Sequence, residues 1–258
     1  MSAKRIILPV IVFGVVTLAW DMAVRLNDIQ PYVLPGPGLV ARTLVADWPV
    51  LASSLLVTLT TALEGFVAAA LGGITLALIF NLSQSLEDAL LPYAIVLQVT
   101  PVIAIAPLLL IYLDQQTAVV ACAFIVAFFP VLANTALGLK SVDRKLGDLF
   151  ALYGASPLQT LLQLKLPAAL PYMLGGLRIA GGLSLIGAVV AEIAAGAAGA
   201  GSGLAYRIAE SSYRLNIPRM FAALLLLSAA GIVIYALLAL ASYLALRRWH
   251  DSALGKDL

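Results

Sequence analysis

Long runs of apolar residues separated by short polar segments occupy most of this chain. Six runs approach or exceed the roughly 20 residues that a helix needs to cross a bilayer: residues 6–24, 55–80, 90–112, 117–137, 172–194 and 220–246. They lack the alternating segments of about ten residues that are typical of membrane barrels. Because a helix satisfies its own backbone hydrogen bonds in lipid, the pattern predicts six transmembrane α-helices.

Composition strengthens the membrane prediction. Hydrophobic residues make up 62% of the 258 residues and charged residues only 11%, whereas soluble domains are about half apolar and a quarter charged. A single soluble core of this size cannot bury so much apolar surface. We therefore expect an all-α integral membrane protein, with residues 1–258 forming a single transmembrane domain in a lipid bilayer.

The N-terminal run resembles a secretory signal, because Lys4 and Arg5 precede it. No convincing small-x-small cleavage site follows, so we interpret the run as a retained first span. Prolines exclude one continuous helix across residues 27–48. There we expect an extended stretch that leads into a short interfacial helix from about Gly38.

Prolines also interrupt the predicted spans. Pro101 and Pro107 fall in the third span and Pro130 in the fourth. Proline frees a backbone carbonyl and kinks a helix. Such kinks suit close packing, and they also suit a pathway that opens alternately to each side; the sequence leaves both interpretations open.

Basic residues predict the orientation in the membrane. Six spans place both termini and the loop between the fourth and fifth spans on one side. That side carries nine Lys and Arg residues and the other carries five, with Arg178 near the start of the fifth span left out of both counts. The positive-inside rule then places both termini in the cytoplasm. The nine are Lys4, Arg5, Lys140, Arg144, Lys145, Lys165, Arg247, Arg248 and Lys256, and the five are Arg25, Arg42, Arg207, Arg214 and Arg219.

The predicted cytoplasmic loop, residues 138–171, has the pattern of a helix–turn–helix. Ser141 is a plausible N-cap for an amphipathic stretch through Tyr153. Gly154 supplies the positive φ that ends that helix. Ser156 and Pro157 then restart a helix as its N-cap and first residue.

The second helix of this loop is expected to stop at Pro167 and Pro171, just before the fifth span. Four leucines share one of its faces and form an apolar ridge. Such a hairpin either lies on the lipid headgroups or docks a partner protein, and the residue pattern favours neither. The four leucines are Leu158, Leu161, Leu162 and Leu166.

The loop resembles the signature of permease subunits in binding-protein-dependent ATP-binding-cassette importers. That signature is an acidic-small-small triplet, a glycine, an apolar residue ten positions further on, and Leu-Pro. The triplet position here, Asp148-Leu149-Phe150, keeps the acid but not the two small residues. The resemblance implies a cytoplasmic coupling helix that engages an ATPase through Asp148, Gly154, Ala155, Ser156, Pro157, Leu164, Leu166 and Pro167.

Further segments, spread over residues 32–250, are similar to the nitrate/sulfonate/taurine/bicarbonate branch of this superfamily. The resemblance implies the type I importer (MetI-like) fold and a bacterial inner-membrane location. It also implies a second, usually identical permease copy, two ATPase subunits that bind ATP and Mg, and a periplasmic or lipid-anchored binding protein. The similar segments are Tyr32–Pro37, Gln98–Pro101, Ala106–Leu109, Gly187–Glu192, Gly201–Leu204 and Ile217–Met220.

Within this branch, the resemblance implies a pathway for a small polar solute that works by alternating access. The solute is expected to be an anion like nitrate, a sulfonate, taurine or bicarbonate, or a pyrimidine, riboflavin or aromatic carboxylate. The chain contains no G-x-x-x-x-G-K-[ST] phosphate loop, so the energy has to come from another polypeptide or an ion gradient. The alternative function is therefore an ion-coupled secondary transporter, although no inverted repeat supports it.

Other classes of function lack their residues. No cluster of His, Cys or paired acids at catalytic spacing is present, so we expect neither an enzyme nor a cofactor or metal in this chain. The lone Cys122 is interpreted as a buried apolar residue and the lone His250 as a solvated or interfacial side chain. A net charge of +2 gives no indication of a nucleic-acid partner.

Four polar residues in or near the spans are candidates for lining the pathway, because polar groups inside membranes are costly. Glu64, the deepest by sequence, either faces the pathway or holds helices together. Glu192 either pairs with Arg207, Arg214 or Arg219 as a structural link or forms an outer gate. Gln98 and Thr100 either line a constriction or bond between helices. The glycine pairs at 72–73 and 181–182 are expected to permit close helix approach.

Overall fold

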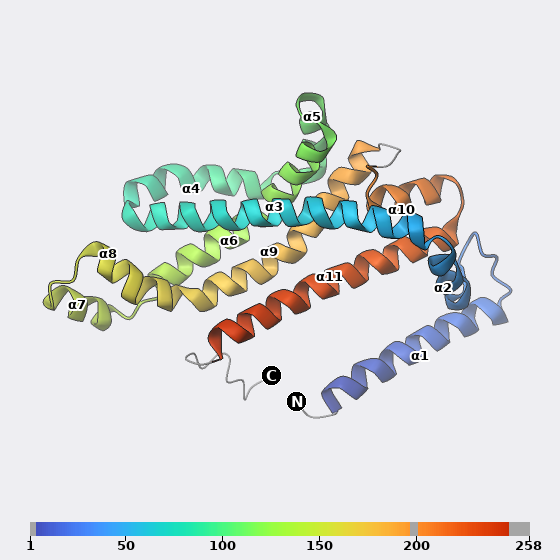
Figure 1. The fold of residues 1–258 in the computed structure, drawn as a ribbon, viewed down its shortest axis with the longest axis horizontal. Helices are drawn as coiled ribbons and strands as arrows, with labels where there is room; N and C mark the ends of the chain where they lie inside the picture. Colours follow the sequence, from blue (N-terminus) through green and yellow to red (C-terminus); the bar gives the residue numbers. More distant parts are fainter. Residues whose placement is uncertain (1–3, 197–200, 248–258) are drawn as a thin grey trace. The chain divides into compact units, whose positions relative to one another are not determined.

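The computed structural model describes residues 4–196 and 201–247, and every regular element in these ranges is helical (Figure 1). The helices fall into two compact units, described separately below. One contains the described residues up to Val57 together with Gly196–Ala229, and the other contains Thr58–Ala195 and the described residues from Ala230 on. In chain order the elements are α1 (Lys4–Leu26), α2 (Pro37–Ala46), α3 (Trp48–Leu82), α4 (Gln84–Val99), α5 (Val102–Tyr112), α6 (Gln115–Lys140), α7 (Arg144–Leu152), α8 (Pro157–Thr160), η1 (Leu161–Lys165), α9 (Leu166–Ala195), α10 (Leu204–Tyr213) and α11 (Ile217–Leu246).

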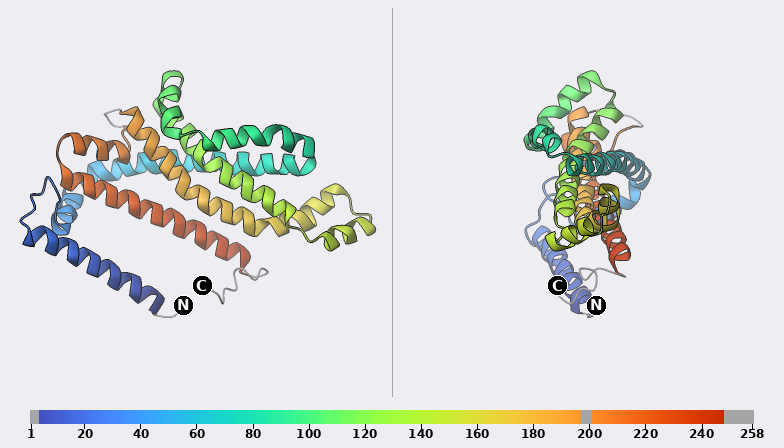
Figure 2. Two further views of the ribbon diagram at one scale, coloured as in Figure 1. Left: turned by 180° about the vertical axis from the view of Figure 1, so that it is seen from behind. Right: turned by 90° about the vertical axis from the view of Figure 1, so that its left-hand side faces the viewer.

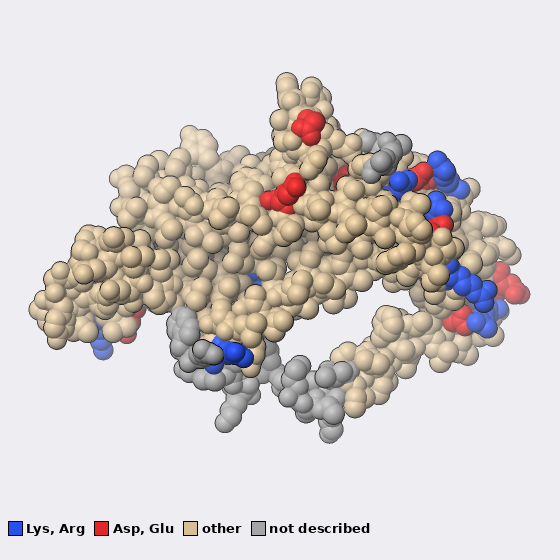
Figure 3. All heavy atoms as spheres, viewed as in Figure 1, with Lys and Arg blue, Asp and Glu red and all other residues tan. Residues whose placement is uncertain are grey.

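The predicted all-α membrane fold is confirmed. Within the described ranges, five helical segments are long and apolar enough to cross a membrane, and the bent pair α4–α5 would be the sixth span. Large apolar side chains on these helices are exposed, for example Phe13 at 71% and Ile232 at 69%. Figure 3 shows few charged side chains on the face that it draws. Exposed apolar surface of this extent fits a protein embedded in lipid.

The third predicted span, residues 90–112, is not one kinked helix. It consists of α4 and α5, which meet at an angle of 98°. Pro101 is the N-cap of α5, and Thr100 before it is extended, with φ −73° and ψ 122°. A residue before proline avoids the helical region, so two consecutive residues leave the helix and the chain turns instead of bending gently.

In the second unit, α6 is packed closely between α3 and α9 (Figure 2). Glycines allow the approach, as expected for Gly73, whose Cβ would lie 2.9 Å from Val131 Cβ. At Gly187 on α9 the backbone of α6 is closer still, since a Cβ there would lie 2.7 Å from the Cys122 carbonyl oxygen. Cys122 itself is fully buried, as predicted.

The glycine pair 181–182 behaves differently at its two positions. A Cβ on Gly181 would collide with Leu238 of α11, which confirms the predicted close approach. At Gly182 the expectation is wrong, because no described atom lies within 4 Å of the Cβ position. Adjacent residues on a helix point about 100° apart, so only one of the two faces α11.

In the first unit, α2 and the starts of α3, α10 and α11 surround a small core. Its buried residues are Val40, Leu51, Leu204, Ala222 and Ala223, with the ring of Trp20 from α1 against Phe221 at 5.8 Å. The rest of α1 is largely exposed, and Asp21 forms an ion pair with Arg25 at 2.8 Å one turn later.

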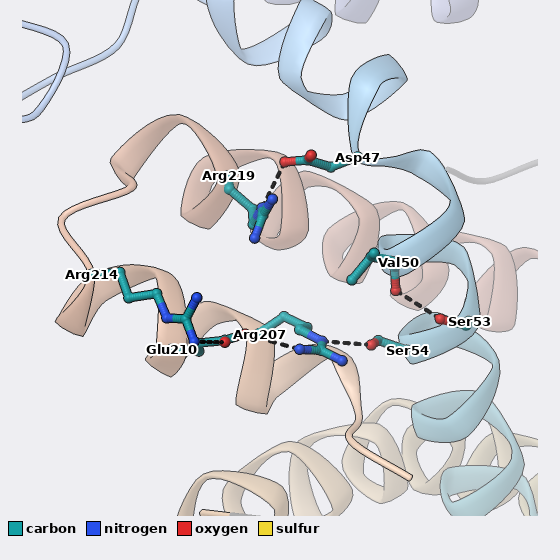
Figure 4. Close-up of polar contacts among 8 residues, drawn as sticks. All are labelled: Asp47, Val50, Ser53, Ser54, Arg207, Glu210, Arg214 and Arg219. Atoms are coloured by element: carbon teal, nitrogen blue, oxygen red, sulfur yellow. Dashed lines mark hydrogen bonds and ion pairs between the residues drawn. The ribbon is translucent and has the colours of Figure 1, made fainter. Parts of the chain in front are cut away.

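Ion pairs fix the polar end of this unit (Figure 4). The Arg219 guanidinium Nε donates to Asp47 Oδ2 at 2.6 Å, joining the start of α11 to the α2–α3 junction. On α10, Glu210 accepts from both Arg207 and Arg214 at 2.9 Å. These arginines therefore have carboxylate partners within their own unit.

Candidate functional site

The first helix of the loop, α7, starts later than the sequence predicts. Ser141 is the C-cap of α6, where its hydroxyl donates to the Gly138 carbonyl at 2.8 Å. Asp143 is the N-cap instead, and its carboxylate accepts from the Lys145 backbone N–H at 2.9 Å. The prediction of Ser141 as N-cap is wrong, because α6 continues to Lys140 and Asp143, an equally good cap, stands two residues later.

The turn after α7 is the predicted glycine turn. Gly154 has φ +69°. Its N–H donates to the Ala151 carbonyl at 3.0 Å, and the Ala155 N–H donates to the Phe150 carbonyl at 3.0 Å. This pair of bonds defines a Schellman motif, whose left-handed residue is most often glycine. No described atom lies within 4 Å of a Cβ at position 154, so backbone conformation rather than space requires glycine there.

The second helix starts as predicted. Ser156 and Gln159 form a capping box, in which the Gln159 side chain accepts from the Ser156 N–H at 2.7 Å. Pro157 occupies the first helical position. A capping box satisfies two otherwise unpaired N–H groups at the helix start, so the position of this helix relative to the turn is well defined.

The second helix does not stop at Pro167 or Pro171, which corrects the prediction. It continues through the π-helical turn η1 into α9, so that one helical segment runs from Pro157 to Ala195. In η1 the Leu166 N–H donates to the Leu161 carbonyl, five residues back. This wider turn accommodates the missing N–H of Pro167 without ending the helix.

The α7–α8 hairpin lies at the end of α6 and α9 that is away from α5 (Figures 1 and 2). Its exposed side chains form an apolar surface. Leu152 is 83% and Tyr153 82% exposed. A shallow cavity of about 430 Å³ lies beside them, lined by Leu149, Phe150, Tyr153, Gly154, Ala155, Gln159 and Gln163. Six exposed apolar side chains of the hairpin form what we call the α7–α8 surface: Leu146, Leu149, Leu152, Tyr153, Leu158 and Leu162.

The predicted apolar ridge on the second helix is divided. Leu158 and Leu162 are exposed, whereas Leu161 and Leu166 pack against the core of the second unit. Of the remaining predicted coupling residues, Asp148, Ser156 and Pro157 are exposed, and Ala155, Leu164 and Pro167 are half-buried. The coupling role of all these residues stays a prediction. Leu166 is partly buried against the core of the second unit, and Asp148 lies on the surface.

Two lysines attach the ends of the loop to the turn between α3 and α4. Lys140, at the end of α6, donates to both carboxylate oxygens of Glu87 at 2.5 and 2.7 Å. Lys165, at the end of η1, donates to Asn81 Oδ1 at 2.8 Å. These contacts are not among those predicted from the sequence. The available signal was an acidic residue and a lysine at the ends of different predicted spans on the same side of the membrane.

We predict that Glu87→Gln loosens this attachment. Glu87 is 8% exposed. The amide of glutamine keeps one acceptor oxygen for Lys140, but it lacks the negative charge and adds a buried NH2 group without a partner, which should destabilise the protein by about 1–3 kcal/mol. The measurement is thermal unfolding of the purified protein in detergent. Asp88→Asn is the matched control, because Asp88 is exposed and, among the described residues, accepts from Gln84 on its own helix. Equal stability of the two variants would contradict a structural role for the Lys140–Glu87 pair.

Glu64, on α3, lies beside the start of α6. Its side chain is exposed, and its Oε2 lies 3.5 Å from the amide nitrogen of Gln116 in the first turn of α6. The 35-residue helix α3 is longer than the bilayer core is thick, so the middle of α3 need not be the middle of the membrane. Asp114 caps the same turn of α6, and hydrogen bonds from the Thr117 hydroxyl and backbone N–H lower the pKa of its carboxyl.

Glu192 is buried and bonded within the second unit. It is 3% exposed, and its Oε2 accepts from the hydroxyl of Thr58 on α3, itself fully buried, at 3.0 Å. This burial favours the structural interpretation of Glu192. Gln98 is exposed on α4, and the Thr100 hydroxyl donates to the Val96 carbonyl at 2.7 Å. A pathway role for these residues stays a prediction.

Comparison with known proteins identifies the fold. Residues 69–251 match the family described as "Binding-protein-dependent transport system inner membrane component". A solved structure described as an amino acid ABC transporter with histidines matches 77% of this chain and 95% of its own with a TM-score of 0.63. Its sequence is 20% identical, so this likeness concerns the fold alone.

Relatives in sequence cover nearly the whole chain. A probable ABC transporter permease protein of Haemophilus influenzae is 34% identical over 90% of this chain and 93% of its own length. The formylaminopyrimidine transport permease protein ThiX of Halalkalibacterium halodurans is 34% identical over 88% of this chain and 90% of its own. Permeases named for nitrate, aliphatic sulfonates and bicarbonate also match, which confirms the resemblance to that branch. The family is one of transport permeases and not of enzymes. The chain therefore belongs to the binding-protein-dependent transport system inner membrane components, and it is an integral membrane permease subunit of an ABC importer for small solutes.

Proposed function

We propose that two copies of this chain form a translocation pathway in the bacterial inner membrane, with both termini in the cytoplasm. A separate ATP-binding-cassette ATPase docks on the α7–α8 surface of each copy, and an external binding protein delivers the solute. The observation that carries this proposal is the exposed apolar α7–α8 surface with its shallow cavity.

A protein partner fits this surface better than lipid headgroups do. Helices that lie on a membrane combine an apolar face with a polar face rich in lysine and arginine. In α7 the two basic residues, Arg144 and Lys145, stand together at the start, and the cavity is lined by two glutamines, Gln159 and Gln163. The capped turns on both sides of Gly154 hold the surface in one shape, as preorganised docking requires.

The helix from Pro157 to Ala195 offers a route for the mechanical signal. Its first turns carry part of the α7–α8 surface, and its later turns pack closely on α6 through Gly176 and Gly187. A tightly packed helix moves as a body rather than deforming. When ATP binding draws the two ATPases together, α8, η1 and α9 therefore transmit the displacement to the pathway.

The solute is a small anion, a pyrimidine, riboflavin or an aromatic carboxylate. The relatives named for formylaminopyrimidine, riboflavin, nitrate and aliphatic sulfonates support the pyrimidine, the riboflavin and the anion in this range.

Reconstitution in liposomes tests the proposal. We expect solute uptake when the chain is combined with its ATPase, its binding protein and ATP, and no uptake when the ATPase is omitted. Uptake by the chain alone, driven by a proton or sodium gradient, would instead establish an ion-coupled secondary transporter.

A further inference from the structure

Arg178 is an arginine inside an otherwise apolar helix. From Leu166 to Ala191, α9 contains no other Asp, Glu, Lys or Arg. Arg178 lies 12 residues after Leu166, about 18 Å along the helix axis, too far for its side chain to reach the end of the helix. A charged side chain at such a position is costly in lipid and marks a functional site by default.

The Arg178 guanidinium lies against α11. Its carbon lies 5.9 Å from the centre of the Tyr235 ring, within the range of a cation–π contact. Tyr235 lies 11 residues before the end of α11, and Arg178 lies 12 residues after the start of α9. Both residues therefore lie well inside their helices. The ring covers one side of the guanidinium and contributes no negative charge to it.

Arg178 has no carboxylate partner among residues 4–196 and 201–247, and its Nε is buried without a hydrogen bond there. In contrast to Arg178, four arginines of this chain each form an ion pair with a carboxylate: Arg25, Arg207, Arg214 and Arg219. An unpaired guanidinium in a low-dielectric site is costly, and an oxyanion is the partner whose geometry it matches best.

The face of α9 beside Arg178 is open. No described atom lies within 4 Å of a Cβ at Gly175 or Gly182, one turn before and one turn after the arginine. On the same face, Ile179 is 52% and Ile186 54% exposed. The opposite face, with Gly176, is packed against α6. The small residues leave space for a ligand next to the guanidinium.

Lipid chains do not fit this face, because hydrocarbon offers the guanidinium no hydrogen-bond acceptor. We propose that Arg178 binds the anionic group of the transported solute, a carboxylate, a sulfonate or a small inorganic oxyanion, within the pathway between two copies of the chain. This inference rests on the proposed function, since it places the open face of α9 in that pathway. It narrows the solute to compounds that carry a negative charge.

Ligand-induced stabilisation tests the site without requiring transport. The probes are nitrate, ethanesulfonate and benzoate, with neutral benzamide as the isostere of benzoate, added at millimolar concentration to the purified chain in maltoside detergent. We expect at least one anion to raise the melting temperature of the wild type, benzamide to leave it unchanged, and Arg178→Gln to abolish the anion's effect. Arg42→Gln on α2 is the matched control, because Arg42 is an exposed arginine of the other unit.

Maltoside carries no phosphate, so stabilisation in it excludes a lipid headgroup as the bound anion. If phosphatidylglycerol stabilises the wild type through Arg178 while no solute anion does, Arg178 binds lipid and the proposal is wrong. If no anion distinguishes Arg178→Gln from the wild type, the proposal is also wrong.

Uptake by the reconstituted complex provides the second readout. We expect Arg178→Gln to reduce uptake of the stabilising anion at least about tenfold, and Arg178→Lys to retain part of it. Wild-type ATP-dependent uptake of a neutral solute, unaffected by Arg178→Gln, would overturn the assignment of Arg178 while upholding the importer. Uptake without ATP would count against the importer itself.

Discussion

Replacing Gly154 by valine is expected to abolish ATP-driven transport while leaving the protein in the membrane. Gly154 has φ +69° in the turn between α7 and α8. A left-handed conformation costs L-residues about 1–2 kcal/mol, and β-branched residues more. The nine-residue helix α7 has no buried residue of its own, so we expect the turn to rearrange and the α7–α8 surface to lose its shape.

Three variants separate conformation from bulk. Gly154→Val should lose co-purification with the ATPase, by at least about tenfold in affinity for a penalty near 2 kcal/mol. Gly154→Asn should retain it, because asparagine tolerates positive φ. Gly147→Ala in α7 is the control, since its Cβ would meet no described atom and its φ is not positive. Normal ATPase binding by Gly154→Val would refute the importance of this turn.

The local features of the coupling hairpin could be predicted because they depend on neighbouring residues. The positive φ of Gly154 and the Ser156 cap each involve bonds that reach no more than five positions along the chain. The same rules failed where two local signals competed. Asp143 displaced Ser141 as N-cap, and a π-helical turn allowed the helix to continue through Pro167.

Contacts between distant segments could not be predicted in this way. Lys140 and Glu87 are 53 residues apart, and Lys165 and Asn81 are 84 apart. Their pairing depends on how α3, α4, α6 and α9 pack, which hydropathy alone does not specify. Hydropathy locates spans because every lipid-facing position must be apolar; it says little about which face of a span meets another helix.

The glycines show that hydropathy does not specify which face of a span meets another helix. One of them, Gly187, is a position where we expect a substitution to lower stability strongly. The sequence contains several glycines in the spans, and only some of them lie between helices. Gly187 does: a Cβ there would lie 2.7 Å from the Cys122 carbonyl oxygen and 2.8 Å from Ala123 Cα. Both neighbours are backbone atoms of α6, which cannot rotate away as a side chain can.

Gly187→Ala is therefore expected to force α6 and α9 apart. Overpacking of this kind costs about 1–3 kcal/mol, and with backbone on both sides we expect the upper end, a loss of about 6–12 °C in melting temperature. Gly176→Ala, whose Cβ would lie 2.9 Å from the Pro130 carbonyl oxygen, should behave similarly. Gly231→Ala on α11 should be neutral, since its nearest neighbour lies 3.5 Å away. Thermal unfolding in detergent measures all three, and equal stability of Gly187→Ala and Gly231→Ala would show that α6 and α9 are not in backbone contact at Gly187.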